Sequence, residues 1–114
     1  MELTPRTLGA IRVLAPAGRI DQSSADAFQA ALAPHLAACS QDGAPLLLDF
    51  AGVEYLSSVG LRVLMLAARQ VEAQGGRIAI AALQPLIKEV FEISRFNLVF
   101  TVYDDVADAA QALT

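Results

Sequence analysis

Residues 46–64, LLLDFAGVEYLSSVGLRVL, hold the junction that decides the fold. Residues 46–50 form a short apolar run, followed by the loop residue Gly52, and this pattern predicts a buried strand of a parallel sheet. Ser57 and Ser58 then stand where the N-cap of a helix belongs. The stretch therefore predicts a strand, a loop and a helix in succession. Two hydroxyl groups lie at the positive end of that helix, where a chain best holds an anion or accepts a phosphate.

The helix after Ser58 has two distinct faces, because each residue of an α-helix turns the chain by about 100°. The face expected to pack on the sheet carries apolar residues at helical spacing, namely Leu61, Leu64, Met65, Ala68 and Val71. The opposite face combines apolar and basic side chains, namely Val59, Arg62, Leu66, Arg69, Gln70 and Ala73. Such a mixed patch beside a helix N-terminus is typical of an interface. Apolar residues scattered on a surface explain it equally well.

The rest of the chain alternates between strand and helix patterns. In the first half of the chain we expect an edge strand at 2–7, a turn at Gly9-Ala10, a strand at 11–15 ended by residues 18–21, and a helix opened by Ser23 or Ser24. The strand 46–50 and the helix after Ser58 follow. In the second half we expect a strand at 77–81, a helix begun by Gln84-Pro85, a strand at 98–103 and a helix at 106–113. This order predicts an α/β fold with an N-terminal hairpin, a mostly parallel sheet of four to five strands and about four helices.

Apolar positions in these elements predict the core and two local features. The helix after Ser24 carries a stripe of Ala25, Phe28, Leu32 and Leu36, and Pro34 inside it predicts a kink or an early end. The helix begun by Pro85 carries Leu86, Val90, Phe91 and Ile93. We expect the sheet core to consist of Ile11, Val13, Leu46, Leu48, Ile78, Ile80 and Val102, with Leu64 and Val71 packed on it.

Length and charge narrow the class of protein. The 114 residues suit one domain, 1–114, that buries its own core. A formal net charge of −4 and only eight scattered basic residues argue against nucleic acid or an anionic membrane surface as the partner. No apolar run approaches the roughly 18 to 20 residues that span a bilayer, and residues 1–6 lack signal-peptide features. We therefore expect a cytoplasmic protein without membrane insertion, in agreement with the lone Cys39.

The residue types needed for common enzyme sites are scarce. His35 is the only histidine, so neither a Ser-His-Asp triad nor a histidine-rich metal site can be assembled. Cys39 resembles a small buried apolar residue, and Gly75-Gly76 marks a helix end. We expect no enzyme activity, no metal and no cofactor. A small enzyme with Ser58 as its nucleophile is disfavoured because no base lies nearby in the sequence.

At residues 52–64, GVEYLSSVGLRVL, the sequence resembles the signature of STAS domains, the family of the bacterial anti-sigma factor antagonists. Residues 57–61, SSVGL, match the Asp-Ser-Ser/Ala-Gly-Leu core of that signature. Three other segments match in order, GRID at 18–21, LDF at 48–50 and FEISRF at 91–96, so the resemblance covers nearly the whole chain. It implies a STAS fold.

The resemblance also implies a switch. Ser58 would be phosphorylated by a partner serine kinase that doubles as an anti-sigma factor, with Asp21, Ser57 and Gly60 near the acceptor. The dephosphorylated form would bind this kinase and release a sigma factor, and the phosphorylated form would let go. The family's usual aspartate is Ser57 here, which makes Ser57 an alternative acceptor.

The same resemblance implies which partners the protein has. ATP would belong to the kinase, and a phosphatase could restore the binding form. We expect the kinase to contact the exposed helix face that carries Val59, Arg62, Leu66 and Arg69. The alternative is a STAS subunit of a transporter complex, which docks on an ATPase without phosphorylation.

Overall fold

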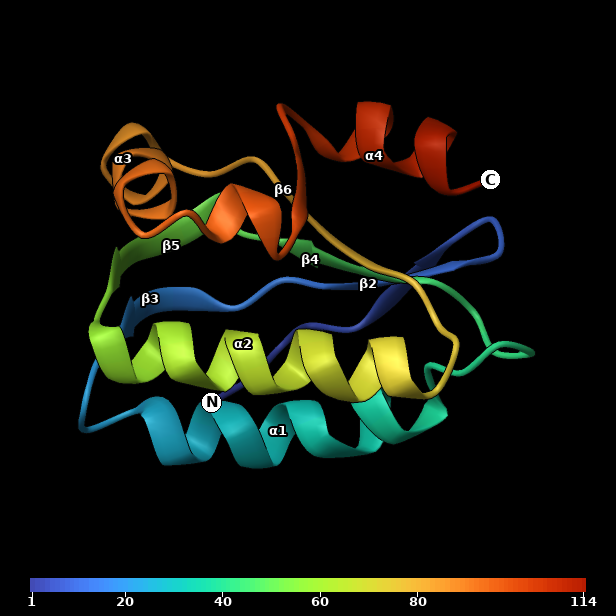
Figure 1. The fold of residues 1–114 in the computed structure, drawn as a ribbon, viewed down its shortest axis with the longest axis horizontal. Coiled ribbons are helices and arrows are strands. Elements are labelled where there is room, and N and C mark those ends of the chain that lie inside the picture. Colours follow the sequence, from blue (N-terminus) through green and yellow to red (C-terminus); the bar gives the residue numbers. More distant parts are fainter.

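The backbone forms a five-stranded sheet and a separate pair of strands (Figure 1). The computed structural model describes all residues, 1–114. The strands of the large sheet, in spatial order, are β1 (Arg6–Leu8), β2 (Ile11–Leu14), β4 (Leu46–Asp49), β6 (Ile78–Ala81) and β7 (Thr101–Tyr103), and the pair consists of β3 (Ala17–Ile20) and β5 (Gly52–Leu56). β1 and β2 form an antiparallel hairpin, and all other pairs are parallel. The predicted α/β class with a mixed, mostly parallel sheet is confirmed.

Helices cover both faces of the large sheet. α1 (Ala25–Ala38) and α2 (Ser58–Ala73) lie side by side on one face, and the short α4 (Val106–Leu113) covers the other (Figure 1). α3 (Pro85–Ile93) packs beside β5 and is followed by a 3₁₀ turn, η1 (Phe96–Leu98). None of these helices has both the length and the apolar character that a bilayer crossing requires.

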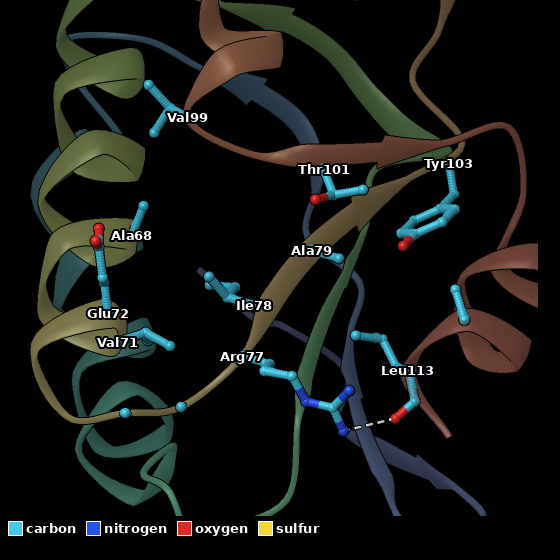
Figure 2. A pocket seen from close by; sticks show the side chains of 13 residues that line it. Ala68, Val71, Glu72, Arg77, Ile78, Ala79, Val99, Thr101, Tyr103 and Leu113 are labelled. Atoms are coloured by element: carbon cyan, nitrogen blue, oxygen red, sulfur yellow. Dashed lines mark hydrogen bonds between the residues drawn. The ribbon is translucent and has the colours of Figure 1, made fainter.

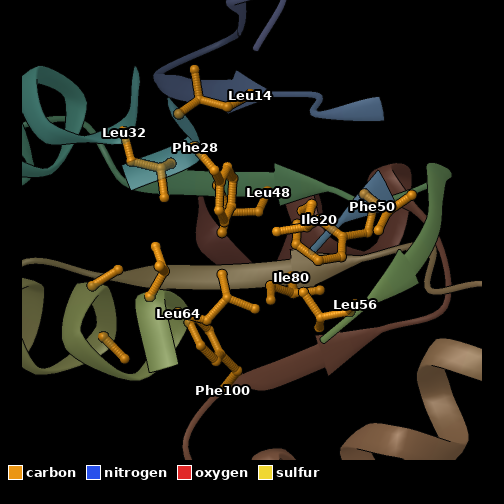
Figure 3. Packing of buried hydrophobic residues seen from close by; sticks show 14 of the residues in the cluster. Leu14, Ile20, Phe28, Leu32, Leu48, Phe50, Leu56, Leu64, Ile80 and Phe100 are labelled. Carbon is orange, nitrogen blue, oxygen red and sulfur yellow. The ribbon is translucent and has the colours of Figure 1, made fainter. Parts of the chain in front are cut away.

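The core follows from the alternation of side chains along each strand. Leu46 and Leu48 of β4 face α1 and α2, whereas Leu47 faces α4. Leu48 lies opposite Ile80, and both pack with Leu64 of α2 in the larger cluster (Figure 3). Most expected core residues are buried, namely Ile11, Val13, Leu46, Leu48, Leu64, Val71 and Ile80, while Ile78 and Val102 are partly buried.

The buried and exposed residues of α2 agree closely with the two predicted faces. Leu64, Ala68 and Val71 are buried as expected, whereas Leu61 and Met65 lie half-buried at the margin. Because α1 packs along α2, the buried arc is wider than the sheet alone requires and also includes Gly60, Val63 and Ala67. All six residues predicted for the outer face are exposed.

One strand pair contradicts the prediction. Residues 18–21 do not end the second strand, because residues 17–20 form β3, a strand of their own. β3 pairs in parallel with β5, whose residues we expected to be a loop. A register shift between Gly18 and Arg19 interrupts this pair. The chain between β4 and α2 therefore returns as a strand before the helix begins.

Both edges of the large sheet are shorter than predicted. At the N-terminal edge only Arg6–Leu8 pairs with β2, and at the other edge the expected strand 98–103 is reduced to Thr101–Tyr103. Residues 96–98 form η1 instead of extended chain. Each edge strand thus has three residues.

Two helices differ from the prediction in detail. α1 continues through Pro34 to Ala38, so the expected early end does not occur. In α3 the side chains that enter the core are Ile87 and Phe91, while Leu86 and Ile93 are exposed. This nine-residue helix buries one narrow stripe, Ile87 and Phe91.

Candidate functional site

The candidate site lies where the parallel strands β3 and β5 end side by side. Ile20 is in register with Leu56, so the residues that follow them, Asp21 and Ser57, leave the strand pair at the same edge. The Ser57 N–H donates to the Ile20 carbonyl at 2.9 Å and ties the two loops together. The carboxyl ends of parallel strands are where α/β proteins gather their functional side chains. The structure therefore brings Asp21 to the start of α2.

Ser57 and Ser58 have different structural roles. Ser57 is the N-cap of α2, and its Oγ accepts a hydrogen bond from the Gly60 N–H at 3.2 Å. Ser58 is the first helical residue, is exposed, and its hydroxyl makes no hydrogen bond within the chain. From the sequence, either serine could cap the helix, because both directly precede the apolar residues at helical spacing. The structure assigns the cap to Ser57. The free hydroxyl belongs to Ser58.

Gly60 allows α2 to start against the strand pair. A Cβ atom at this position would lie 2.6 Å from Leu56 Cδ1 and 2.9 Å from Ile20 Cγ2, closer than real Cβ contacts. Any larger residue would require a shift of the buried Leu56 and Ile20 side chains or of the first turn of α2. Gly60 thus allows the first turn of α2 to pack closely against Leu56 and Ile20.

The Asp21 carboxylate is held by the loop that leads into α1. Its Oδ1 accepts hydrogen bonds from the Ser23 N–H at 3.0 Å, the Ser23 hydroxyl at 2.7 Å and the Ser24 hydroxyl at 3.3 Å. Arg19 Nε lies 3.5 Å from Asp21 Oδ2. The Ser23 hydroxyl is the main cause of the lowered pKa of Asp21. This carboxylate is therefore ionised at neutral pH and is paired with the Arg19 guanidinium.

Arg19 and Tyr55 extend the site across the strand pair. The Arg19 guanidinium lies 4.2 Å from the centre of the Tyr55 ring, within cation–π range. Neither residue was predicted to belong to the site, because their contact depends on the unpredicted pairing of β3 with β5. The shifted pairing places Arg19 opposite Tyr55.

The outer face of α2 starts at the candidate site. Val59 and Leu66 are 39 % and 42 % exposed, large fractions for aliphatic side chains. Arg62 and Arg69 are exposed on the same helix and form no ion pair within the chain. Arg62 lies one helical turn after Ser58. The structure thus places all four residues of the predicted docking face on exposed positions of α2.

His35 and Cys39 lie outside the site. Cys39 is buried and its Sγ contacts the Arg77 carbonyl at 3.2 Å. Burial raises the pKa of this thiol, so it stays protonated at neutral pH. Burial also lowers the pKa of His35, with a smaller contribution from Arg12. Neither residue approaches the Ser57-Ser58 pair in the fold.

Ser57→Ala should destabilise the protein by about 1 kcal/mol, because the first turn of α2 loses its side-chain cap. Ser58→Ala removes a hydroxyl without a hydrogen bond and serves as the matched control, with an expected change below about 0.5 kcal/mol. Urea unfolding followed by circular dichroism measures both values. A larger loss in Ser58→Ala would assign the cap to Ser58 and contradict this geometry.

Comparisons with known proteins agree on one family. The sequence model described as "Mlab, STAS domain" matches residues 4–101. BtrV of Bordetella bronchiseptica, which its name describes as a candidate anti-sigma factor antagonist, is 32% identical over 112 residues. The alignment spans 98% of this chain and 94% of BtrV.

Solved structures show the same fold. An anti-sigma factor antagonist from Mycobacterium paratuberculosis has a TM-score of 0.84 at 24% identity, with 96% of this chain and 90% of that chain covered. The anti-sigma factor antagonist SpoIIAA in its unphosphorylated form has a TM-score of 0.74 at 17% identity, with 96% and 93% covered. Its phosphorylated form, from Bacillus, has a TM-score of 0.69 at 16% identity, with 97% and 98% covered.

Proposed function

The chain belongs to the STAS domain family, and we propose that it is an anti-sigma factor antagonist whose partner binding is switched by phosphorylation of Ser58. Without phosphate it binds an anti-sigma factor that is also a serine kinase, and a sigma factor is released. With phosphate it leaves that kinase, and a phosphatase restores the binding form. The protein is a cytoplasmic binding module in this proposal, and ATP is the substrate of its partner.

The observation that carries the proposal is the free hydroxyl of Ser58 at the N-terminus of α2. A kinase needs an accessible hydroxyl, and Ser58 is exposed and makes no hydrogen bond within the chain. Ser57 is half-buried and its oxygen already caps the helix. Transfer to Ser57 would disrupt that cap, which favours Ser58 as the acceptor.

The surroundings of Ser58 can hold a phosphate without a change of fold. The unpaired N–H groups of the first turn and the helix dipole stabilise a negative charge by about 0.3 to 1 kcal/mol at an exposed position. Arg62 lies four residues later, a spacing at which helical side chains are neighbours. Among the proteins similar in fold, SpoIIAA has been solved both with and without phosphate.

The same helix supplies a docking surface next to the switch. Val59 and Leu66 offer aliphatic surface that excludes water, and Arg62 and Arg69 offer guanidinium groups free to pair with carboxylates. An acidic, partly apolar surface on the kinase suits this face. A phosphate at Ser58 then adds negative charge at the edge of the contact.

The direct test is phosphate transfer. The protein is incubated with ATP and serine kinases encoded near its gene, and mass spectrometry locates the phosphate. We expect phosphate on Ser58 in the native chain and in Ser57→Ala, and none in Ser58→Ala. Ser57→Asp is the matched control, because it keeps a capping oxygen and restores the aspartate typical of the family. Transfer that persists in Ser58→Ala and disappears in Ser57→Ala would make Ser57 the acceptor.

Leu66→Asp should weaken binding to the kinase by about fivefold, which corresponds to roughly 1 kcal/mol, because it buries an unpaired charge in the contact. The melting temperature should stay nearly unchanged, since Leu66 is exposed on the outer face of α2. Isothermal titration calorimetry measures the affinity, and Gln29→Asp, at an exposed position of α1 outside this face, gives the effect of an added charge alone. Native affinity in Leu66→Asp would move the interface elsewhere.

A further inference from the structure

A cavity of about 430 Å³ lies at the β7 edge of the large sheet, between the C-terminal half of α2 and α4 (Figure 2). It exists because β7 is shorter than β6. β7 starts with Thr101 opposite Ala79, so Ile78 has a neighbour in β4 but none in β7. We call this space the edge cavity, and its volume falls within the range of small-molecule sites.

A backbone N–H of β6 points into the edge cavity. The Leu46 N–H donates to the Arg77 carbonyl at 2.9 Å, so the peptide groups of Arg77 face β4. In a parallel ladder successive residues direct their N–H and C=O groups to opposite sides. The Ile78 N–H therefore points away from β4 and meets no carbonyl of β7, which begins one residue further along. It is a free donor in the wall of the cavity.

Three side chains that line the edge cavity add further donors. The Arg77 Nη2 donates to the Leu113 carbonyl at 2.8 Å, which holds the guanidinium at the cavity (Figure 2). Arg77 forms no ion pair within the chain, and its other N–H groups remain available. The hydroxyls of Thr101 and Tyr103 make no side-chain hydrogen bonds within the chain either. The cavity thus gathers donors with one positive charge.

The remaining lining is mostly apolar. Val71 of α2, Ile78 of β6 and Val99 before β7 provide aliphatic surface on the α2 side of the sheet edge, across the edge from Arg77 and Tyr103 on the α4 side (Figure 2). Glu72 is the only acidic side chain of the lining, and it lies on α2, more than 4 Å from the Arg77 guanidinium. An anionic group is therefore repelled from the α2 wall and attracted to the Arg77 wall.

We propose that the edge cavity binds a small carboxylate with an aliphatic body. The carboxylate accepts hydrogen bonds from the Arg77 guanidinium and from the Thr101 and Tyr103 hydroxyls, while the aliphatic part covers Val71, Ile78 and Val99. Arginine suits this role because its planar group pairs with both oxygens of a carboxylate. The pairing of a single cation and several donors with an apolar wall selects against amines and against neutral alcohols.

This site is independent of the phosphorylation switch. Ser58 and Glu72 lie at opposite ends of α2, about 20 Å apart along the helix axis. Binding in the edge cavity can therefore be tested on the isolated chain without kinase or phosphate.

The test is a titration of the ¹⁵N-labelled protein with sodium octanoate, followed by NMR. We expect saturable shifts of the Ile78, Thr101 and Tyr103 amides with a Kd of about 1 mM, a value in keeping with a ligand of this size. The Ser58 amide should not move. Octanol and octylamine at the same concentrations are the matched ligands and should bind at least fivefold more weakly.

Arg77→Gln should weaken octanoate binding at least fivefold and leave any octanol binding unchanged, whereas Lys88→Gln, at an exposed cation of α3 that does not line the edge cavity, should have no effect. If Arg77→Gln does not fold, the double variant Thr101→Val with Tyr103→Phe takes its place, with the same expectation. Equal binding of octanoate and octanol, shifts centred outside the edge cavity, or native octanoate affinity in these variants would overturn the proposal.

Discussion

Leu64→Ala is expected to lower the free energy of unfolding by about 2 to 5 kcal/mol. Leu64 is fully buried in α2 and packs with Leu48, Ile80 and Phe100 in the larger core cluster (Figure 3). Its truncation removes apolar contacts and leaves a cavity that the surrounding strands cannot close, since they are fixed by their hydrogen-bonded neighbours.

Leu66→Ala is the matched control on the same helix, because Leu66 is 42 % exposed and reaches no core cluster. We expect a loss below about 1 kcal/mol for this variant. Urea unfolding of both variants, with a common m-value, gives the comparison. Equal losses would show that the inner and outer faces of α2 are assigned the wrong way round.

Phosphorylation of Ser58 is expected to lower the affinity for the kinase at least tenfold, which corresponds to about 1.4 kcal/mol. The phosphate adds about −1.5 to −2 charges and three acceptor oxygens at neutral pH. In the proposed contact it would lie beside Val59, where the unphosphorylated protein would bury a small hydroxyl, so complex formation would strip water from a doubly charged group.

Calorimetry on the native, phosphorylated and Ser58→Ala proteins measures this effect. Ser58→Ala should bind constitutively, and Ser58→Asp should weaken binding in part, because it carries less charge. Circular dichroism should be the same for all forms, since the phosphate lies at an exposed helix start. Equal affinity of the native and phosphorylated proteins, with the phosphate mapped to Ser58, would exclude a switch at this position.

The sequence was sufficient for the main sheet and its helices because their signals are local. The apolar run at 46–50 and the spacing after Ser58 depend on neighbouring residues only, and the structure has β4 and α2 at these places. The β3–β5 pair was not predicted. Residues 52–56, GVEYL, bury only Val53 and Leu56, so they lack the strict alternation of a strand, and their partner lies more than thirty residues earlier in the chain.

In the candidate site too, only the features with local sequence signals could be predicted. The two serines could be found from their place before a helical pattern. Which of them caps the helix and which has the free hydroxyl depends on a one-residue difference in where the helix starts, and helix-start signals do not resolve this difference. The neighbours Arg19 and Tyr55 could not be found at all, because only the register of β3 with β5 places them together. In α3 the prediction included the buried Phe91 but missed Ile87 and included the exposed Leu86 and Ile93, because a nine-residue helix is too short for its period to be read reliably.

The brevity of the two edge strands has a consequence for behaviour at high concentration. A sheet edge with many unpaired N–H and C=O groups is a template for another chain, and such templating leads to aggregation. Each edge strand of this sheet has three residues. Successive residues of a strand direct their N–H and C=O groups to opposite sides, so only part of these groups faces outward. A second copy finds too few hydrogen bonds there to add a strand. The protein can therefore keep an aliphatic helix face open to a partner while its sheet resists growth into fibres.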